Sequence, residues 1–377
     1  MRIRPAFSLP VMALNWDQAL AWRLRRHLLD PVGTSSVRDV VSRLAAVPAH
    51  PETTPELAVG LRRIGARVGD VARALDAGEV FKTYAFRGAT HLLTPEEGGA
   101  YLAIRASGRQ WELRSWQETY GLAPGDWPAF RETVREAVAV QPLTRHELSV
   151  EVRRRRRFRD AAAGLNSNSD TLLKSLMWQG DLCFGPARDG EATVQDPRRV
   201  ARWAGLPDID DAGRWAVEAY VRTYGPTSAD SVQYYLGAGL SAGRALRDWL
   251  DDLSDRLVTI DIDGEDMLLF ADDADDLVST EVSPTVRLLP AADPWVMGPG
   301  TADPHVVPPA NRQPVTRGAN LVVASGVVAG TWTRKAGTLT VSWFGEANPP
   351  EHDLLVEEAS RLAAVLGTEL DLSVTPT

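Results

Sequence analysis

A plan that recurs three times along the chain constrains its fold more than any other feature: short amphipathic helices followed by a β-hairpin. The first copy, residues 10–122, places its helices before EVFKTYAFRGATHLL, an alternating ribbon that turns at Arg87-Gly88. The second copy spans residues 123–207, and the third, residues 208–284, closes with the hairpin RLVTIDIDGEDMLLF. Helices followed by a two-stranded ribbon are the order expected of a winged helix.

The remaining part of the chain, residues 285–377, follows a different plan. Two strand-like runs, LVVASGVVAGTW and TLTVSWF, precede one amphipathic helix, LLVEEASRLAAVLG. We therefore predict an α+β fold in which three tandem winged-helix domains and a β-rich C-terminal region form a DNA-binding channel. A winged helix can place one helix in a groove while its hairpin contacts phosphates. Such domains also bind other proteins, and that alternative stays open.

Charge is unevenly distributed along the chain. The net charge is −9, yet residues 1–160 hold 25 Lys and Arg against 18 Asp and Glu. This polarity favours phosphate contacts in the first half and solubility in the second. Arg153, Arg154 and Arg155 begin the strongest basic run and are candidate phosphate contacts, although a solvated face explains the run equally well. The acidic cluster Asp272–Asp276 lacks the spacing of a calcium loop, and we expect it to be solvated.

Several classes of protein are disfavoured. A single cysteine, Cys183, excludes an internal disulfide and indicates a reducing compartment. The first residues do not read as a signal peptide, and no apolar run approaches the roughly 18 residues of a membrane span. We expect a cytoplasmic protein without a membrane partner. Six scattered histidines and the absence of a phosphate-binding glycine loop predict no metal or cofactor. Ser241 lies in a G-x-S-x-G sequence, but the segment before it is helical, which argues against a hydrolase nucleophile.

Five segments resemble the winged-helix DNA glycosylases of the AlkZ and YcaQ type. In order they are LNWDQALAWRLRRHLL, FKTYAFRGATHLL, LLKSLMWQGDLCFGP, AYVRTYGPTSADSV and VRLLPAADPWVMGPG. The resemblance implies three winged helices around a channel for duplex DNA, closed by a β-rich C-terminal region. It also implies cleavage of the N-glycosidic bond of alkylated purines, including bulky natural-product adducts and some interstrand crosslinks.

One departure from that family falls in its catalytic motif. The family has Gln-x-Gln or Gln-x-Asp in the loop after the second helix, whereas this chain reads Val47-Pro48-Ala49-His50. Pro48 stands at the first motif position and offers no side-chain hydrogen bond. His50 stands at the second. Either catalysis has moved to His50 and its neighbours, or the protein binds lesions without cleaving them.

The chemistry of alkylated purines needs little from the enzyme. An N7-alkylated purine already carries positive charge, so the enzyme mainly stabilises an oxocarbenium-like sugar and positions a water molecule. A neutral imidazole can accept the proton of that water, which makes His50 the candidate base; an ordinary loop histidine is the alternative. Glu52, the nearest carboxylate in sequence, and Asp293, in the family-like stretch LLPAADPW, are candidates to orient the imidazole or stabilise the cation.

Further residues are candidates for contact with DNA or the lesion. Pro48 lies in the motif loop, Arg26 lies on the basic face of the first helix, and Arg87 and His91 lie on the first hairpin. A solvated hairpin tip with a half-buried His91 is the alternative for the last two. Because no lysine lies near the site in sequence, we expect a monofunctional glycosylase.

The leading hypothesis is therefore a monomeric glycosylase that removes N7- or N3-alkylated purines from double-stranded DNA, serving self-resistance against an alkylating natural product. A non-catalytic DNA- or lesion-binding protein is the main alternative.

Overall fold

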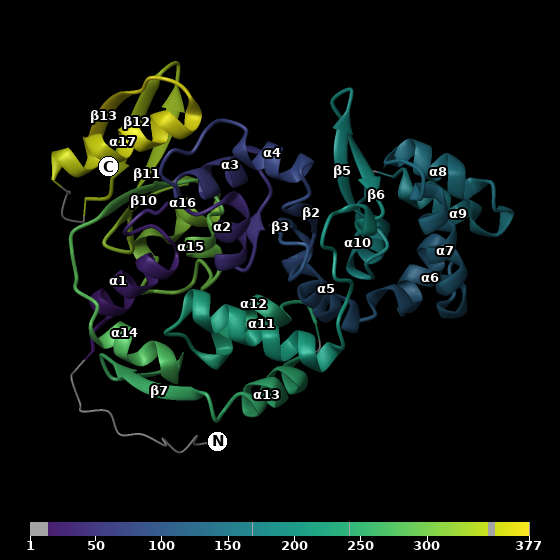
Figure 1. Ribbon diagram of the computed structural model, residues 1–377, viewed down its shortest axis with the longest axis horizontal. Coiled ribbons are helices and arrows are strands. Elements are labelled where there is room, and N and C mark those ends of the chain that lie inside the picture. Colours follow the sequence, from purple (N-terminus) through teal and green to yellow (C-terminus); the bar gives the residue numbers. More distant parts are fainter. Residues whose placement is uncertain (1–13, 168, 241, 346–350, 377) are drawn as a thin grey trace.

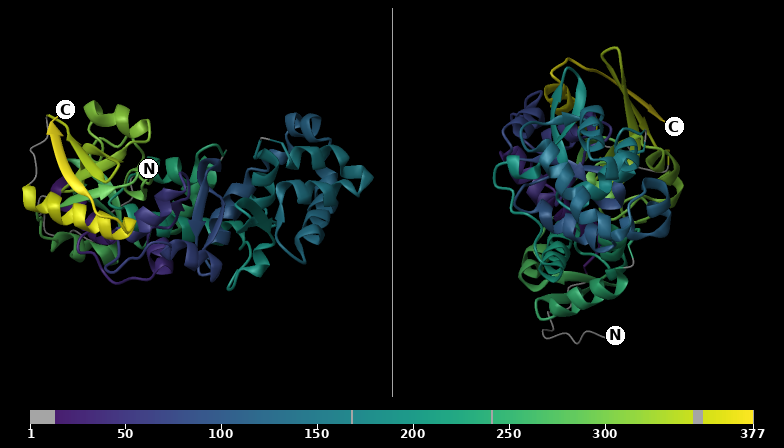
Figure 2. Two further views of the ribbon diagram at one scale, coloured as in Figure 1. Left: turned by 90° about the horizontal axis from the view of Figure 1, so that it is seen from above. Right: turned by 90° about the vertical axis from the view of Figure 1, so that its right-hand side faces the viewer.

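The computed structural model describes residues 14–167, 169–240, 242–345 and 351–376. The molecule mixes helices and sheets and is elongated, with residues 114–165 at one end and the C-terminal strands at the other (Figures 1 and 2). Among the described residues, none of the helices combines the length and apolarity needed to cross a membrane.

The first segment builds a three-stranded sheet after its helices. Its elements are α1 (Trp16–Arg26), α2 (Val37–Arg43), β1 (Val47–Pro48), α3 (Thr53–Gly60), α4 (Asp70–Asp76), β2 (Phe81–Tyr84) and β3 (Thr90–Leu93). The strand order is β1-β3-β2. Ser36 and Asp39 form a capping box that starts α2. The turn of the hairpin is reached through Arg87 (φ 51°) and Gly88 (φ 70°), and the whole hairpin lies near the middle of the molecule (Figure 1).

The second segment repeats this strand order. Two helices, α5 (Gly98–Ser107) and α6 (Arg114–Tyr120), lead to it. Its elements are α7 (Trp127–Val138), β4 (Leu143–Thr144), α8 (Arg145–Arg153), α9 (Arg159–Leu165), α10 (Thr171–Trp178), β5 (Cys183–Arg188) and β6 (Glu191–Gln195). The strands pair in the order β4-β6-β5. The predicted capping box at the start of α8, between Thr144 and Glu147, is confirmed.

The third segment has the same helices and hairpin. Its elements are α11 (Ile209–Tyr224), α12 (Ala229–Gly237), α13 (Gly243–Asp252), β7 (Leu257–Ile262), β8 (Glu265–Phe270) and α14 (Ala274–Val278). A single bridge between Thr227 and Leu268 stands where the first two segments have a short strand. Asp263 and Gly264 both have positive φ, as the predicted two-residue turn requires. Ser241 lies outside the described residues, and the segment before it is the expected helix α12.

The C-terminal part forms one five-stranded sheet with helices around it. Its elements are β9 (Val286–Leu289), α15 (Pro294–Met297), α16 (Arg312–Thr316), β10 (Asn320–Ala324), β11 (Val327–Lys335), β12 (Thr338–Trp343), α17 (His352–Leu366) and β13 (Asp371–Pro376). The strand order is β13-β12-β11-β10-β9, and only β12 and β13 pair in parallel, connected through α17. The sequence predicted β10 to β12 and α17, but it missed the two edge strands.

Two expectations about the N-terminal helix need correction. Although α1 precedes the first segment in sequence, it packs against α11 and α14 of the third. Part of the acidic cluster that we expected to be solvated faces it: Arg25 pairs with Asp276 at 3.0 Å, and Arg26 with Asp273 at 3.5 Å, whereas Asp272 and Asp275 are exposed. The cluster thus neutralises the cations of α1. One apolar core also runs through residues 45–270 and crosses the expected boundaries at 122 and 207, so those domain limits stay predictions.

Candidate active site

His50 lies in a short loop that leaves the first sheet. Pro48 is buried in β1, directly opposite His91 of β3. The backbone amide of Ala49 donates to the carbonyl oxygen of Thr90 at 2.8 Å. His50, the next residue, is exposed. The two positions of the motif therefore differ in environment: Pro48 is part of the sheet, and only His50 can reach a bound molecule.

The other end of this loop is attached to the C-terminal part of the chain. The hydroxyl of Thr54, in the first turn of α3, donates to the carbonyl oxygen of Ala291 at 3.1 Å. Just beyond α3, Arg62 donates to both carboxylate oxygens of Asp293, at 2.7 and 2.9 Å. Both side chains of this ion pair are completely buried. The His50 loop is thus fixed on two sides, to the first hairpin and to residues 291–293.

Asp293 does not occupy the position expected of a residue that contacts the sugar. Arg62 binds both of its oxygens, and one of them also accepts the backbone amide of Trp295 at 2.8 Å, which starts α15. With no exposed surface, this carboxylate cannot touch DNA. It holds the segment beside the His50 loop in place.

Glu52 is exposed, and among the described residues no hydrogen bond joins it to His50. It borders a groove of about 510 Å³ between α4 and the β5–β6 hairpin. Lys82 and Phe184 line the same groove, with the ammonium group 5.3 Å from the ring centre. Glu52 therefore faces the space between the first and second segments.

His91 belongs to the interior of the hairpin. Its side chain is buried, its Nδ1 lies 3.0 Å from the carbonyl oxygen of Ala89, and its ring meets Phe86 edge to face. Burial, helped by the nearby charge of Arg87, lowers the pKa of His91 to about 4. A neutral, buried ring of this kind supports the sheet opposite Pro48 and does not contact DNA.

Arg87 joins the first hairpin to the third segment. Its guanidinium lies 5.1 Å from the ring centre of Tyr234 in α12, and Nη1 donates to the Tyr234 hydroxyl at 2.6 Å. We call this contact the Arg87–Tyr234 clasp. Sequence reasoning missed Tyr234, although adjacent tyrosines at 234 and 235 in a helix cannot both face the core. Tyr235 is buried, and Tyr234 is 43% exposed.

Arg26, in contrast, is half-buried in a contact with the third segment. Its Nε donates to the carbonyl oxygen of Arg222 at 3.0 Å, and its guanidinium lies 5.0 Å from the ring centre of Trp22. Burial lowers the pKa of Arg26. The basic face predicted for the first helix is thus an internal contact with the third segment.

Comparison with known proteins identifies the family of the chain. A family model described as "DNA glycosylase AlkZ-like" matches residues 41–365. The chain belongs to the AlkZ-like DNA glycosylase family. It is 32% identical over 362 residues to an "Interstrand DNA cross-link repair glycosylase" of Streptomyces sahachiroi, covering 94% of this chain and 98% of that protein. The solved structure of Streptomyces sahachiroi DNA glycosylase AlkZ is similar with a TM-score of 0.91 and 31% identity, covering 97% of this chain and all of that one.

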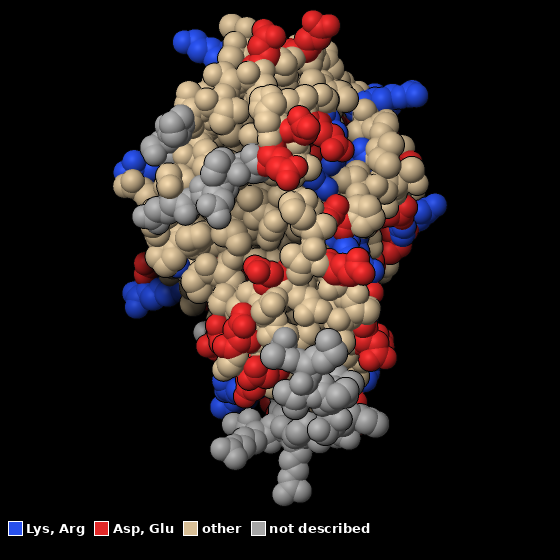
Figure 3. Space-filling view, turned by 90° about the vertical axis from the view of Figure 1, so that its left-hand side faces the viewer, with Lys and Arg blue, Asp and Glu red and all other residues tan. Residues whose placement is uncertain are grey.

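The arginine run of this AlkZ-like glycosylase lies far from His50. Arg153, Arg154 and Arg155 are exposed at the end of α8, at the opposite end of the molecule from the C-terminal sheet (Figures 1 and 2). Arg154 pairs with Glu151 at 2.5 Å, and Arg155 with Glu136 at 3.0 Å. The run is on the surface, partly balanced by neighbouring carboxylates. On the face in Figure 3, acidic side chains spread over the middle while Lys and Arg lie mainly at the margins.

One lysine lies closer to the first hairpin in three dimensions than its place in the sequence suggests. Lys174 of α10 places its Nζ 4.9 Å from the ring centre of Tyr84 and 3.6 Å from the position that a Cβ would take on Gly88. Lys174 lies beside β2 of the hairpin, whereas the His50 loop follows β1. These strands are separated by β3, so they are about 10 Å apart.

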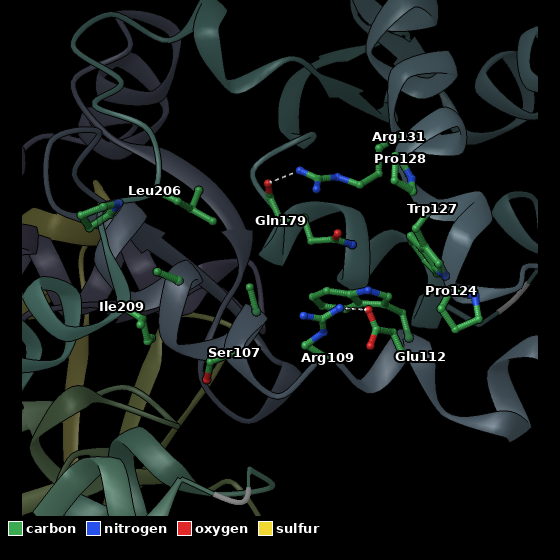
Figure 4. A pocket seen from close by; sticks show the side chains of 14 residues that line it. Ser107, Arg109, Glu112, Pro124, Trp127, Pro128, Arg131, Gln179, Leu206 and Ile209 are labelled. Carbon is green, nitrogen blue, oxygen red and sulfur yellow. Dashed lines mark hydrogen bonds and ion pairs between the residues drawn. The ribbon is translucent and has the colours of Figure 1, made fainter. Parts of the chain in front are cut away.

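A larger pocket of about 550 Å³ opens elsewhere, between α5, α7 and α10 (Figure 4). Trp127 and Gln179 line it, and Arg131 donates to the carbonyl oxygen of Gln179 at 3.0 Å. No residue of the His50 loop or of the first hairpin borders it. Within the part of the chain that the structure describes, three or more His, Cys, Asp or Glu side chains nowhere gather as a metal ion would require.

Proposed function

We propose that this AlkZ-like protein is a monofunctional glycosylase that hydrolyses the N-glycosidic bond of N7- or N3-alkylated purines in double-stranded DNA. The observation that carries the proposal is the position of His50. It is the exposed residue of a loop fixed on one side by the Ala49–Thr90 hydrogen bond and on the other by the Thr54–Ala291 hydrogen bond. Because the chain is anchored on both sides of His50, the backbone presents its imidazole at a defined place, where it can act as a base.

The reaction needs one base and one water. The bond between C1′ and the purine nitrogen breaks, and the electron pair leaves with the cationic base, which becomes neutral. The oxygen of water bonds to C1′ while its proton passes to the imidazole of His50. Glu52, exposed two residues further on, adds negative charge that favours the developing sugar cation. Asp293 acts as a positioning residue through its ion pair with Arg62, because it is too deeply buried to contact the sugar.

The rest of the molecule would hold the duplex. We propose that the three helix-and-hairpin segments act as winged helices around DNA, with the C-terminal sheet closing the channel. Arg153, Arg154 and Arg155 would contact phosphates far from the lesion, and Arg87 would approach it. The protein would act as a monomer, since one chain supplies every group named above.

The test is excision from a duplex that contains one N7-methylguanine, followed by alkali to break abasic sites. We expect strand breaks with the wild-type protein and a loss of at least 100-fold with His50→Ala, because general-base catalysis contributes about 10²–10⁴-fold. His146→Ala, an exposed histidine in α8, is the matched control and should keep full activity. Equal activity of the two variants would exclude His50 as the base.

Lys174 makes a second measurement necessary. A lyase would form a Schiff base between this amine and the sugar, which borohydride traps as a covalent protein–DNA complex. A monofunctional enzyme forms none, and Lys174→Gln should keep its excision rate. If a trapped complex forms with the wild type and disappears in Lys174→Gln, the protein is a lyase that uses Lys174, and the proposed hydrolytic mechanism is wrong.

A non-catalytic lesion-binding protein is the alternative, and the buried Pro48 at a motif position favours it. That protein would bind alkylated duplex in a salt-sensitive way without producing any abasic sites.

The relative from Streptomyces sahachiroi is named for interstrand crosslink repair. We propose bulky natural-product adducts, crosslinks included, as lesions of this protein and self-resistance as its role. Separation of crosslinked strands on a denaturing gel tests this directly.

A further inference from the structure

A pocket of about 400 Å³ lies where α1, the start of α12 and residues 299–305 meet, within the size range of small-ligand sites. Arg23 of α1 reaches it from inside the molecule, with only 2% of its surface exposed. Its Nη2 donates to the carbonyl oxygen of Pro226 at 2.9 Å, just before α12 begins. Trp16 and His305, whose ring centres are 3.6 Å apart, stack and form one wall. The buried guanidinium is therefore the floor of a pocket.

Several donors that border this pocket have no acceptor. Nε and Nη1 of Arg23 and Nε1 of Trp16 are buried, and none of them has a hydrogen-bond partner among the described residues. Buried polar groups are paired in the large majority of cases, and a buried charge without a partner is strongly destabilising. Burial lowers the pKa of Arg23, and the nearby charge of Asp303 opposes this effect. The guanidinium can thus accept a negatively charged partner that the described side chains do not supply.

The start of α12 adds to the attraction for an anion. Its cap, Ser228, lines the pocket together with Ser231 and accepts the backbone amide of Ser231 at 3.1 Å. The first amides of a helix have no acceptor within the helix, and the helix dipole makes this end positive. Arg23 is attached to the same place, because it binds Pro226 two residues before the cap. A carboxylate on Arg23 would therefore also be close to the positive end of α12.

The opening of the pocket carries the opposite charge. Asp230 and Glu265 are exposed, Asp303 is half-buried, and all three carboxylates line the pocket. Glu265 lies 3.1 Å from Nε2 of His305, whereas Asp230 has no ion pair in the part of the chain that the structure describes. Three carboxylates repel a polyanion such as the DNA backbone and attract a cation. The pocket thus suits a small molecule that is negative at one end and positive at the other.

We propose that this pocket binds a small zwitterion of the amino acid type, with its carboxylate on Arg23 and its ammonium group among the carboxylates at the opening. The site is separate from the proposed glycosylase chemistry, because none of its lining residues belongs to the His50 loop or the first hairpin. A short aliphatic chain between the two charges would lie against apolar walls, which include Trp16 and Met267.

The experiment is isothermal titration calorimetry of the full-length protein with glycine, β-alanine and γ-aminobutyrate, whose two charges are separated by increasing distances. Each is compared with the carboxylic acid that lacks the amino group and with the amine that lacks the carboxylate. We expect at least one of the three to bind at least about fivefold more tightly than both of its analogues, since each charge has its own partner in the pocket. Equal affinity for the acids and the amino acids, tighter binding of inorganic phosphate, or no binding at all would overturn the proposal.

Variants test the two ends of the ligand separately. Arg23→Met should abolish binding of the amino acid and of the acid alike. Because Arg23 is buried, Asp303→Asn is the second variant, and its side-chain oxygen can still accept the backbone amide of His305. It should weaken binding of the amino acid by about fivefold, the effect of a partly exposed ion pair, without weakening binding of the acid.

Asp266→Asn is the matched control, because it removes the same charge from an exposed position of β8 outside the pocket. It should change the affinity for neither ligand. If Asp303→Asn and Asp266→Asn have equal effects, the ammonium group is not held at the opening and the proposal is wrong.

Discussion

At the scale of single residues, the surroundings of a side chain decide whether it can act on DNA. His50 and Asp293 were both candidates for chemistry, yet one is exposed and the other is completely buried against Arg62. Burying two charges removes them from water, and only their attraction to each other offsets this loss of solvation free energy. The Arg62–Asp293 pair therefore fixes the segment beside His50 only as long as both partners are present.

We expect Asp293→Asn to destabilise the protein by about 3–5 kcal/mol, because it leaves the buried charge of Arg62 without its partner. Urea unfolding followed by tryptophan fluorescence measures this. The double variant Arg62→Met, Asp293→Leu, which removes both charges, is the control and should cost less than Asp293→Asn alone. A cost below about 1 kcal/mol for Asp293→Asn would show that the pair does not hold this segment.

His91 predicts how stability depends on pH. Its pKa in the folded protein is about 4, below the unfolded value of 6.5, so the unfolded chain binds the additional proton first as the pH falls. The contribution of His91 to the free energy of unfolding is fully present above about pH 6.5. It falls by about 1.4 kcal/mol per pH unit between about pH 6.5 and 4. The buried His27, whose pKa is also lowered by burial, acts in the same direction.

The measurement is urea unfolding of the wild type and of His91→Asn, whose amide can still donate to Ala89, at pH 7 and pH 5. We expect the wild type to lose about 2 kcal/mol more than the variant over this range. Parallel losses in the two proteins would mean that His91 is already charged or is exposed in the folded state.

At the scale of elements, the site depends on how α3 docks. This helix follows the His50 loop and packs against α17 of the C-terminal part. Gly60, its last residue, faces Val365 so closely that a Cβ there would lie 2.6 Å from the nearer methyl carbon. A β-branched side chain cannot rotate away easily, so this contact sets the distance between the two helices.

We expect Gly60→Ala to destabilise the protein by about 1–3 kcal/mol through overpacking, despite the better helix propensity of alanine. Val365→Ala removes the obstructing methyl groups, so the double variant should cost less than the sum of the two single changes. A double-mutant cycle from urea unfolding provides the coupling free energy. Strict additivity would mean that the helices do not meet at these two residues.

At the scale of the whole molecule, cations and acids are arranged over a long body. The arginine run lies at the end of α8, at the opposite end of the molecule from the C-terminal sheet (Figure 1), whereas Asp273 and Asp276 of the acidic cluster pair with the arginines of α1. A contact so distant from the lesion can contribute to DNA affinity without contributing to the chemical step.

We expect the triple variant Arg153→Gln, Arg154→Gln, Arg155→Gln to weaken DNA binding and to flatten its salt dependence. The slope of log K against log salt should fall by roughly 0.9 for each phosphate contact that is lost. Single-turnover excision at saturating protein should keep its rate, and Arg256→Gln in the third segment should change neither quantity. An unchanged slope for the triple variant would identify the run as a solvated face.

Local signals were enough to predict the succession of elements. Apolar periodicity located the helices, the Thr144–Glu147 capping box started α8, and Asp263-Gly264 turned the third hairpin, because each signal acts within a few residues. The strands β9 and β13 were missed because they are edge strands whose pairing depends on distant partners. The AlkZ-like family, too, could be recognised from segments of the sequence alone.

The composition of the site was decided by the tertiary structure. Arg87 meets Tyr234 across 147 positions of sequence, and Arg62 meets Asp293 across 231. Folding also turned Arg26 inward and brought Lys174 beside the first hairpin. A local pattern records whether a residue suits a helix or a strand, but not which distant chain will cover it. Burial and partnership, and with them the ability of a side chain to reach DNA, exist only once the segments have packed together.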